Sequence, residues 1–232
     1  MQKNIKNTPE DDKEQAIVES IYEAVIDQRL APGTKLPEAV LCEAFGVGRM
    51  RIRRCLLVLA SREVIDLQAN RGAFVACPSP KQAKEIFEAR LSIEPTIAML
   101  AAQKAKPADI KNLEKHLMKE SIAHNAGNRR EAIRLSGQFH NSLAMIADNQ
   151  VLLKIVKDLV TRSSLIIGMF GSSGITNCRD DEHAGIIQAL RSADGALAAN
   201  LMTDHLNHIK DHLQLDKPAT VADDLLSLFK PD

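Results

Sequence analysis

The second part of this chain repeats one pattern, in which amphipathic segments of helical length are separated by very short breaks. Apolar residues recur there every three or four positions, the spacing of helices that bury one face. The predicted helices span residues 80–104, 107–125, 129–147, 150–170, 175–192 and 194–215, with a short helix near 221–229. Because short connections make consecutive helices run antiparallel, this pattern predicts an all-α antiparallel bundle.

Composition supports a mainly α fold and narrows the function. Aromatic residues make up only 3% of the chain and Trp is absent, which argues against a β-sandwich or a β-barrel. Thirty basic residues balance thirty acidic ones, so any recognition of a polyanion must be local. The polar residues at the start of the chain do not include the apolar core of a signal peptide, and no apolar run long enough to cross a bilayer is free of charged residues. The four cysteines form no C-x-x-C pair. We therefore expect a cytoplasmic protein with reduced thiols and no membrane partner.

The segment before Cys77-Pro78-Ser79-Pro80 has a different pattern. Its predicted elements are a flexible tail at 1–12, helices that begin at Lys13, Pro37 and Arg49, and strands at 64–68 and 73–76. Two helices joined by a tight turn and followed by a β-hairpin are typical of a winged helix-turn-helix. The sequence thus predicts a DNA-binding domain at 13–77 and a helical effector-binding and dimerisation domain at 78–232.

Basic charge gathers in this first domain where DNA would be contacted. The segment from Arg49 to Gly72 holds six arginines against two acidic residues, a net charge of +4 in a neutral chain. An isolated arginine cluster is usually a solvated helix face, but this one coincides with the tight turn and the hairpin tip. The arginine fork can bond a phosphate or two acceptors of guanine. The predicted contacts to double-stranded DNA are Arg49, Met50, Arg51, Arg53, Arg54, Arg71 and Gly72.

These residues also carry a family resemblance. The triplet Leu36-Pro37-Glu38, the run from Phe45 to Leu56 and the run from Asn70 to Val75 resemble the GntR family of bacterial transcription regulators. The resemblance implies that Arg49, Arg53 and Gly72 contact a palindromic operator, which a homodimer binds.

The resemblance is incomplete within the helix-turn-helix. Gly48, Met50-Arg51 and Arg54 stand where the family usually has Ser, Thr-Pro and Glu. The operator sequence is therefore not implied, and the added charges at Arg51 and Arg54 should raise the affinity for phosphates.

Three histidines stand out in the second domain. His140, His183 and His205 each lie on the apolar stripe of a different predicted helix. A buried imidazole needs partners for both nitrogens, and bundle cores often build metal sites from facing helices. One such histidine is usually a hydrogen-bonded core residue, whereas three favour a shared site. The other histidines at 116, 208 and 212 are interpreted as ordinary polar residues, and the one at 124 is left open.

The second domain resembles the FCD ligand-binding domain of the FadR-type branch of the GntR family. The resemblance rests on Arg90-x-x-x-Glu94, Phe139-His140, Glu182-His183 and His205-Leu206. It implies that an Asp together with His140, His183 and His205 binds zinc or nickel, and that Arg90 and the metal hold a small carboxylate effector.

This chain departs from the FCD pattern at one ligand, because Ser136 stands at the position of the Asp. Two versions of the site stay open. The three imidazoles bind a metal whose shell is completed by water or effector, or Ser136 and the histidines bond the effector directly. Arg90 has an alternative role as well, in an ion pair with Glu94.

Three functions compete at this point. A ligand-responsive repressor that senses a small organic acid explains both domains. A metal-dependent enzyme could use the three histidines to activate water, but no Asp or Glu general base is evident beside them, and the winged helix would be unexplained. A structural DNA-binding protein has no need to bury three imidazoles. We therefore expect a regulator and not an enzyme.

Overall fold

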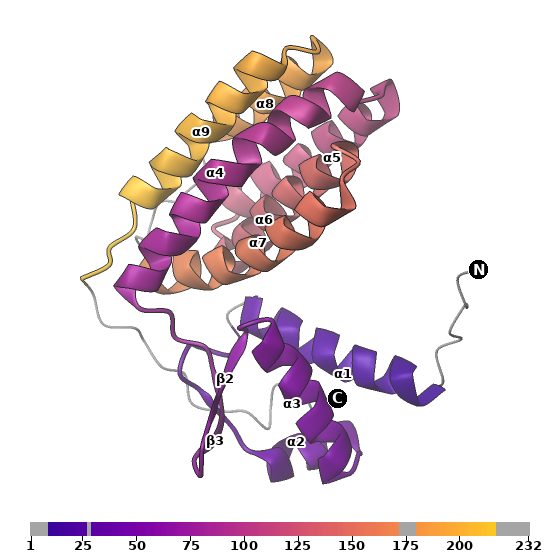
Figure 1. Cartoon of the computed structure of the whole chain (residues 1–232), viewed down its shortest axis with the longest axis vertical. Helices are drawn as coiled ribbons and strands as arrows, with labels where there is room; N and C mark the ends of the chain where they lie inside the picture. The colour runs from indigo at the N-terminus through magenta and orange to yellow at the C-terminus, as the bar shows by residue number, and fades with distance from the viewer. Residues whose placement is uncertain (1–8, 27–28, 172–179, 217–232) are drawn as a thin grey trace. The chain divides into compact units, whose positions relative to one another are not determined.

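The computed structural model describes residues 9–26, 29–171 and 180–216, which fall into two compact units divided between Cys77 and Pro78. The first unit holds α1 (Pro9–Ile26), β1 (Lys35–Leu36), α2 (Glu38–Phe45), α3 (Arg49–Ser61), β2 (Ile65–Gln68) and β3 (Gly72–Val75). The second unit holds α4 (Pro80–Lys104), α5 (Pro107–Asn125), α6 (Arg129–Ile146), α7 (Gln150–Phe170), α8 (Asp180–Arg191) and α9 (Gly195–Asp211) (Figure 1). The predicted fold class, a winged helix-turn-helix followed by a helical bundle, is confirmed.

Helix α1 begins earlier than predicted. The prediction placed a flexible tail up to residue 12, but the helix already begins at Pro9. Proline suits a first helical turn because the missing N–H is unpaired there in any case, and Asp12 adds a favourable negative charge near the helix N-terminus. Residues 1–8 of the predicted tail lie outside the described part of the chain.

The helix-turn-helix forms as its spacing indicates. Helix α2 ends at Phe45, and the left-handed backbone of the next residue, Gly46 (φ 60°), turns the chain so that α3 can begin at Arg49. The buried face of α3 consists of the four residues expected from its periodicity, Ile52, Cys55, Leu56 and Leu59. This face packs against α1, which buries Ile17, Ile21 and Val25.

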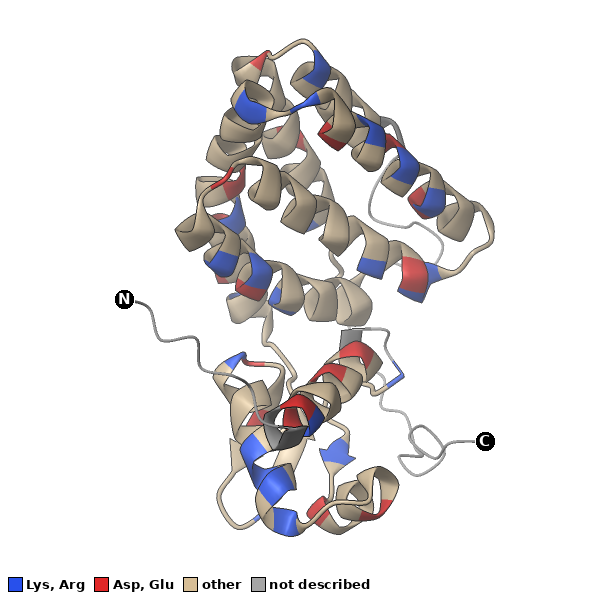
Figure 2. Ribbon diagram, turned by 90° about the vertical axis from the view of Figure 1, so that its right-hand side faces the viewer, with Lys and Arg blue, Asp and Glu red and all other residues tan. Residues whose placement is uncertain are grey.

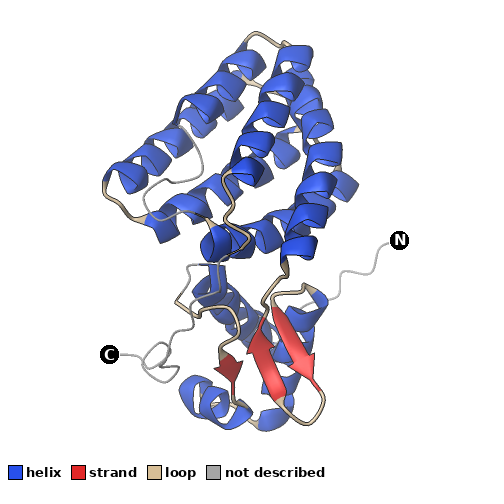
Figure 3. Cartoon of the chain, turned by 90° about the vertical axis from the view of Figure 1, so that its left-hand side faces the viewer, coloured by secondary structure: helices blue, strands red, loops and turns tan. Residues whose placement is uncertain are grey.

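The wing is a three-stranded antiparallel sheet in the order β1-β3-β2 (Figure 3). The sequence predicted only the hairpin of β2 and β3. Strand β1 was missed because two residues are too short to show an alternating pattern, and Leu36 pairs with Ala73 of β3. At the hairpin tip Gly72 has φ +99°, a conformation that favours glycine over any other residue.

The second unit is a helical bundle in which α4 packs against α6, α7, α8 and α9. Its buried apolar core includes Phe139, Leu143, Ile186 and Leu206. Helix α9 ends at Asp211 instead of residue 215, because Leu213 forms a β-bridge with Gly171. Residues 175–179 of the predicted fifth bundle helix and the predicted short helix at 221–229 lie outside the described residues. No helix in the described ranges has the length and hydropathy needed to cross a bilayer.

Candidate metal centre, effector cavity and nucleic-acid interface

The three predicted histidines come together inside the bundle. His140 on α6, His183 on α8 and His205 on α9 are 2%, 1% and 0% exposed. The Nε2 atom of His205 lies 3.2 Å from Nε2 of His183 and 3.3 Å from Nε2 of His140. One potential ligand atom from each ring falls within 4.8 Å of the other two. The stripes of three separate helices therefore converge on a single cluster.

Each ring turns its other nitrogen, Nδ1, towards a carboxylate. The pairs are His140 with Glu94 at 2.6 Å, His183 with Glu120 at 2.9 Å and His205 with Glu182 at 2.8 Å. An ionised carboxylate only accepts hydrogen bonds, so in a neutral ring the proton belongs on Nδ1. The hydrogen bonds to Glu120 and Glu182 therefore favour this tautomer in His183 and His205, and the short contact with Glu94, which lacks hydrogen-bond geometry, favours it in His140. This tautomer leaves a lone pair on each Nε2.

The three Nε2 lone pairs therefore face one another at close range, an arrangement that suits a cation between them. Zinc binds imidazole nitrogens at about 2.0–2.1 Å, so the corners of a tetrahedral site lie about 3.3 Å apart. Two of the Nε2–Nε2 distances, 3.2 and 3.3 Å, agree with that spacing, and the potential ligand atoms of all three rings lie within 4.8 Å of one another. Carboxylates behind the imidazoles are also the usual outer shell of histidine metal sites. The residues present thus fit a divalent metal.

The electrostatics around His140, His205 and Glu94 favour the protonation states that a metal requires. Burial lowers the pKa of His140, although Glu94 opposes this, and it lowers the pKa of His205 far below the usual value. Burial alone would raise the pKa of Glu94, but the charge of Arg90 and the contact with His140 bring it down to about 2. Ionised carboxylate and neutral imidazole are the forms needed for ligation.

Arg90 lies beside this cluster in a buried ion pair. Its side chain is 2% exposed, its Nε bonds Oε1 of Glu94, and its Nη1 donates to the hydroxyl of Ser163 at 2.9 Å. The guanidinium charge is thus already balanced by Glu94, which is the alternative that the sequence left open. Arg90 also lines a cavity, so its contact with an effector stays a prediction.

That cavity adjoins the histidine cluster. Its volume is about 30 Å³, and its lining residues include Arg90, Ser136 and His140. Of the three clustered histidines, His140 alone is among the residues that line the cavity. Gly137 also lines the cavity, and a Cβ atom there would come 3.0 Å from Cγ1 of Val160. The glycine therefore keeps space open inside a helix, where alanine would be the favoured residue.

The predicted DNA contacts lie on α3 and at the hairpin tip. Figure 2 shows basic residues gathered along α3, with acidic residues along α1. The exposed members of the predicted set are Arg49, Met50, Arg53, Arg54, Arg71 and Gly72, and Arg51 is partly buried. The Arg71 guanidinium lies 5.3 Å from the centroid of the Phe74 ring, which holds it at the tip.

Comparison with known proteins identifies both units. Residues 13–75 match the family described as bacterial regulatory proteins, gntR family, and residues 85–208 match the FCD domain. The chain belongs to the GntR family of transcriptional regulators. The family and its relatives are regulators, so the enzyme hypothesis is excluded.

Relatives align along most of this GntR regulator. It is 26% identical over 201 residues to the HTH-type transcriptional repressor RspR of Escherichia coli, covering 86% of this chain and 88% of the relative. It is 28% identical over 209 residues to the galactonate operon transcriptional repressor of the same organism, covering 80% and 90%. A GntR structure from Rhodococcus sp. RHA1 shares the fold, with a TM-score of 0.75 and 18% identity over 86% of this chain and 96% of that one.

The pairing of carboxylates with the three histidines of this GntR regulator was not predicted from its sequence. The sequence showed no general base beside the histidines in a motif, and it named Glu94 and Glu182 only as part of the family pattern, yet Glu94, Glu120 and Glu182 each contact one of the three rings. Glu120 carried a usable signal, because it follows the buried Leu113 by seven residues on the apolar face of α5.

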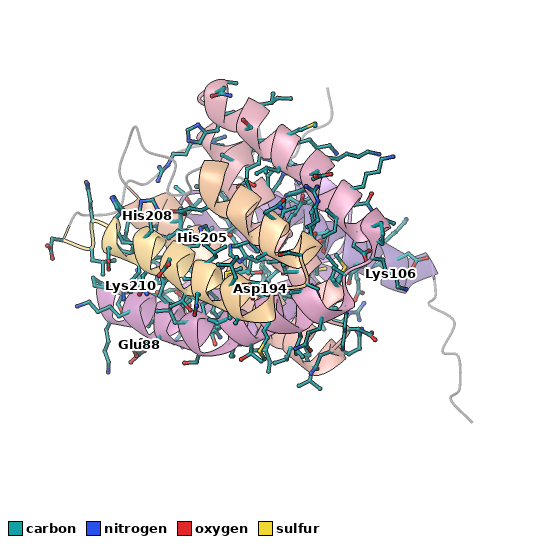
Figure 4. All side chains as sticks on the ribbon, turned by 90° about the horizontal axis from the view of Figure 1, so that it is seen from above. Glu88, Lys106, Asp194, His205, His208 and Lys210 are labelled. Atoms are coloured by element: carbon teal, nitrogen blue, oxygen red, sulfur yellow. The ribbon has the colours of Figure 1, made fainter. Side chains whose placement is uncertain are left out.

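The prediction for His208 was incomplete as well. It follows His205 on α9 (Figure 4), and its Nδ1 lies 2.7 Å from the second carboxylate oxygen of Glu182. Instead of an independent polar residue, it is a further partner of the carboxylate that orients His205.

Proposed function

We propose that this GntR regulator represses transcription by binding a palindromic operator as a homodimer, and that a small carboxylate effector in its FCD domain changes its affinity for DNA. The two domains that such a switch needs are both present, and the relatives include two proteins named as repressors. One of them is named for the galactonate operon, and galactonate is itself a carboxylate.

The effector site includes zinc or nickel held by His140, His183 and His205. The observation that carries this assignment is the set of three Nε2 lone pairs that face one another while every Nδ1 is engaged by a carboxylate. A hydrogen-bonded core cluster needs a proton on one Nε2 of each pair, whereas the tautomer that the carboxylates favour places the proton of each ring on Nδ1. Both metals accept imidazole ligands.

The protein's own side chains would orient the effector. When bound, the metal supplies a positive centre with open positions for an oxygen ligand. Ser136 lies one helical turn before His140 and lines the same cavity, at the position where the family's Asp would stand. Arg90, which lines the cavity, would meet the effector's carboxylate while it stays paired with Glu94.

Metal analysis tests the site directly. Protein purified without chelator, or reconstituted with zinc and then dialysed, should hold about one metal ion per chain. His205→Ala should abolish this, because it removes the ring that contacts the other two. His212→Ala should not, because His212 is an exposed histidine that follows the last residue of α9. A wild-type protein that retains no stoichiometric zinc or nickel would refute the metal centre.

DNA binding tests the sensor role. The probe is a duplex that the wild-type protein selects from a random-sequence pool, and small organic acids that raise the thermal unfolding midpoint are the candidate effectors. A ligand can act only through different affinities for two states of the protein. Binding curves with and without such an acid should therefore separate, and curves that coincide for every acid bound would exclude the proposal.

A further inference from the structure

Two acidic residues of the first unit hold arginines of α3 in different ways. Glu38, in the first turn of α2, accepts two hydrogen bonds from Nε of Arg53, at 2.9 Å to Oε1 and 3.0 Å to Oε2. Within the described ranges no acceptor bonds either Nη group of Arg53, and the side chain is 57% exposed. The carboxylate of Glu38 thus binds Nε of Arg53 and leaves the two Nη groups of the guanidinium to bond other acceptors.

Glu14 on α1 contacts its arginine from the side. Its Oε1 accepts a bond from Nε of Arg54 at 2.9 Å and another from Nη2 of the same residue. The same oxygen lies 3.5 Å from Nε of Arg51. The hydrogen bond from Arg54 lowers the pKa of Glu14, so the carboxylate stays ionised at neutral pH. Glu14 therefore occupies the very edge through which a guanidinium makes paired bonds with an anion.

We propose that Glu38 positions Arg53 for DNA contact, whereas Glu14 withholds Arg54 from it. The proposal builds on the DNA binding of this family and is independent of the metal and effector. A guanidinium fixed through Nε loses less conformational freedom when its fork bonds a base or a phosphate. A guanidinium held by its edge can bond a phosphate only after its carboxylate partner is released.

The two carboxylates should therefore have opposite effects on recognition. Glu38 adds to discrimination among sequences, because it fixes the direction of a fork that can read acceptors in the major groove. Glu14 limits sequence-independent affinity, because it competes with phosphates for a cation. Arg54 replaces the Glu usual in the family at this position, so Glu14 balances a charge that is particular to this chain.

The test compares Glu38→Gln and Glu14→Gln, which each remove one negative charge, with Glu23→Gln on the exposed side of α1 as the matched control. Full-length proteins are titrated with two 30-bp duplexes, one selected by the wild type from a random pool and one of mixed sequence, at several salt concentrations. Glu38→Gln should lower the ratio of the two affinities about tenfold. Glu14→Gln should raise the affinity for both duplexes and steepen the slope of log K against log salt by about 0.9 per protomer, the value for one added phosphate contact. Glu23→Gln should change neither quantity.

Two results would overturn the proposal. One is an equal rise in the affinity for both duplexes in Glu38→Gln as well as in Glu14→Gln, which would indicate a simple charge effect. The other is an unchanged salt slope for Glu14→Gln. A merely structural role of Glu38 is tested in an Arg53→Ala background. If Glu38 acts through Arg53, adding Glu38→Gln there leaves the affinity ratio unchanged, whereas a further tenfold loss would show that Glu38 acts by another route.

Discussion

Replacing Glu120 by Gln separates a metal centre from an ordinary buried hydrogen-bond cluster. Glu120 is 5% exposed, and its Oε2 lies 2.9 Å from Nδ1 of His183. The amide oxygen of Gln can accept the same bond, so the metal-free fold should change in stability by less than about 1 kcal/mol. A charge-assisted bond is about twice as strong as a neutral one, and a neutral bond contributes about 1 kcal/mol. If the hydrogen bond that orients the His183 ring weakens by about 1–1.5 kcal/mol in the metal-bound state, metal binding becomes about tenfold weaker.

The assay is competition for zinc between the protein and a chromophoric chelator, with thermal unfolding of the metal-free proteins beside it. Glu114→Gln on the same helix is the control, because Glu114 pairs with Arg191 at the surface. The zinc dissociation constant should rise about tenfold or more for Glu120→Gln and stay unchanged for Glu114→Gln. An unchanged constant for Glu120→Gln would refute the role of His183 as an oriented ligand. A large fall in metal-free stability would show that the carboxylate mainly holds the fold.

Other outcomes follow from the same geometry. Ser136→Asp should tighten zinc or nickel binding by about tenfold or more in calorimetric titrations, because it adds an anionic ligand one turn before His140. Gly137→Ala places a methyl group 3.0 Å from Val160 Cγ1 and 3.4 Å from Ser164 Oγ, so thermal-shift responses to organic acids should fall while the zinc content is retained. Zinc affinity should decline only at a pH well below the usual imidazole range near 6.5, because protonated imidazoles cannot ligate and burial lowers the pKa of His140 and His205, and a chelator dye can follow the release. Arg49→Ala should cost about 1–3 kcal/mol of discrimination between selected and mixed-sequence duplexes in gel-shift titrations.

Helix boundaries set by local chemistry could be predicted from the sequence. Helix α4 begins at Pro80 because Ser79 forms a capping box with Gln82, and α7 begins at Gln150 because Asn149 caps it. Boundaries that depend on distant residues could not. The end of α9 is set by the bridge between Leu213 and a residue at the end of α7, and strand β1 exists only because β3 pairs with it.

The candidate site divides in the same way. The histidines could be located because an imidazole on an apolar stripe must point inward. Their carboxylate partners could not, since glutamate is rarely buried and its partner lies on another helix. Glu94 could be linked only to Arg90, four residues away on the same helix, although its Oε2 also lies 2.6 Å from Nδ1 of His140 on α6. Local spacing shows the first contact, whereas only the packing of α4 against α6 shows the second.

The charge of the cluster gives a reason for Ser136. With neutral imidazoles, the three carboxylates and the one guanidinium of Arg90 leave a net charge of −2, which a divalent cation would bring to zero. An Asp at position 136 would make the metal-loaded cluster negative again, and an anionic effector would then meet repulsion in a buried cavity. With Ser136, the effector's own carboxylate can occupy the place that the Asp would take. Ser136→Asp should therefore tighten metal binding and weaken the binding of organic acids, and a variant that strengthened both would contradict this account of the site.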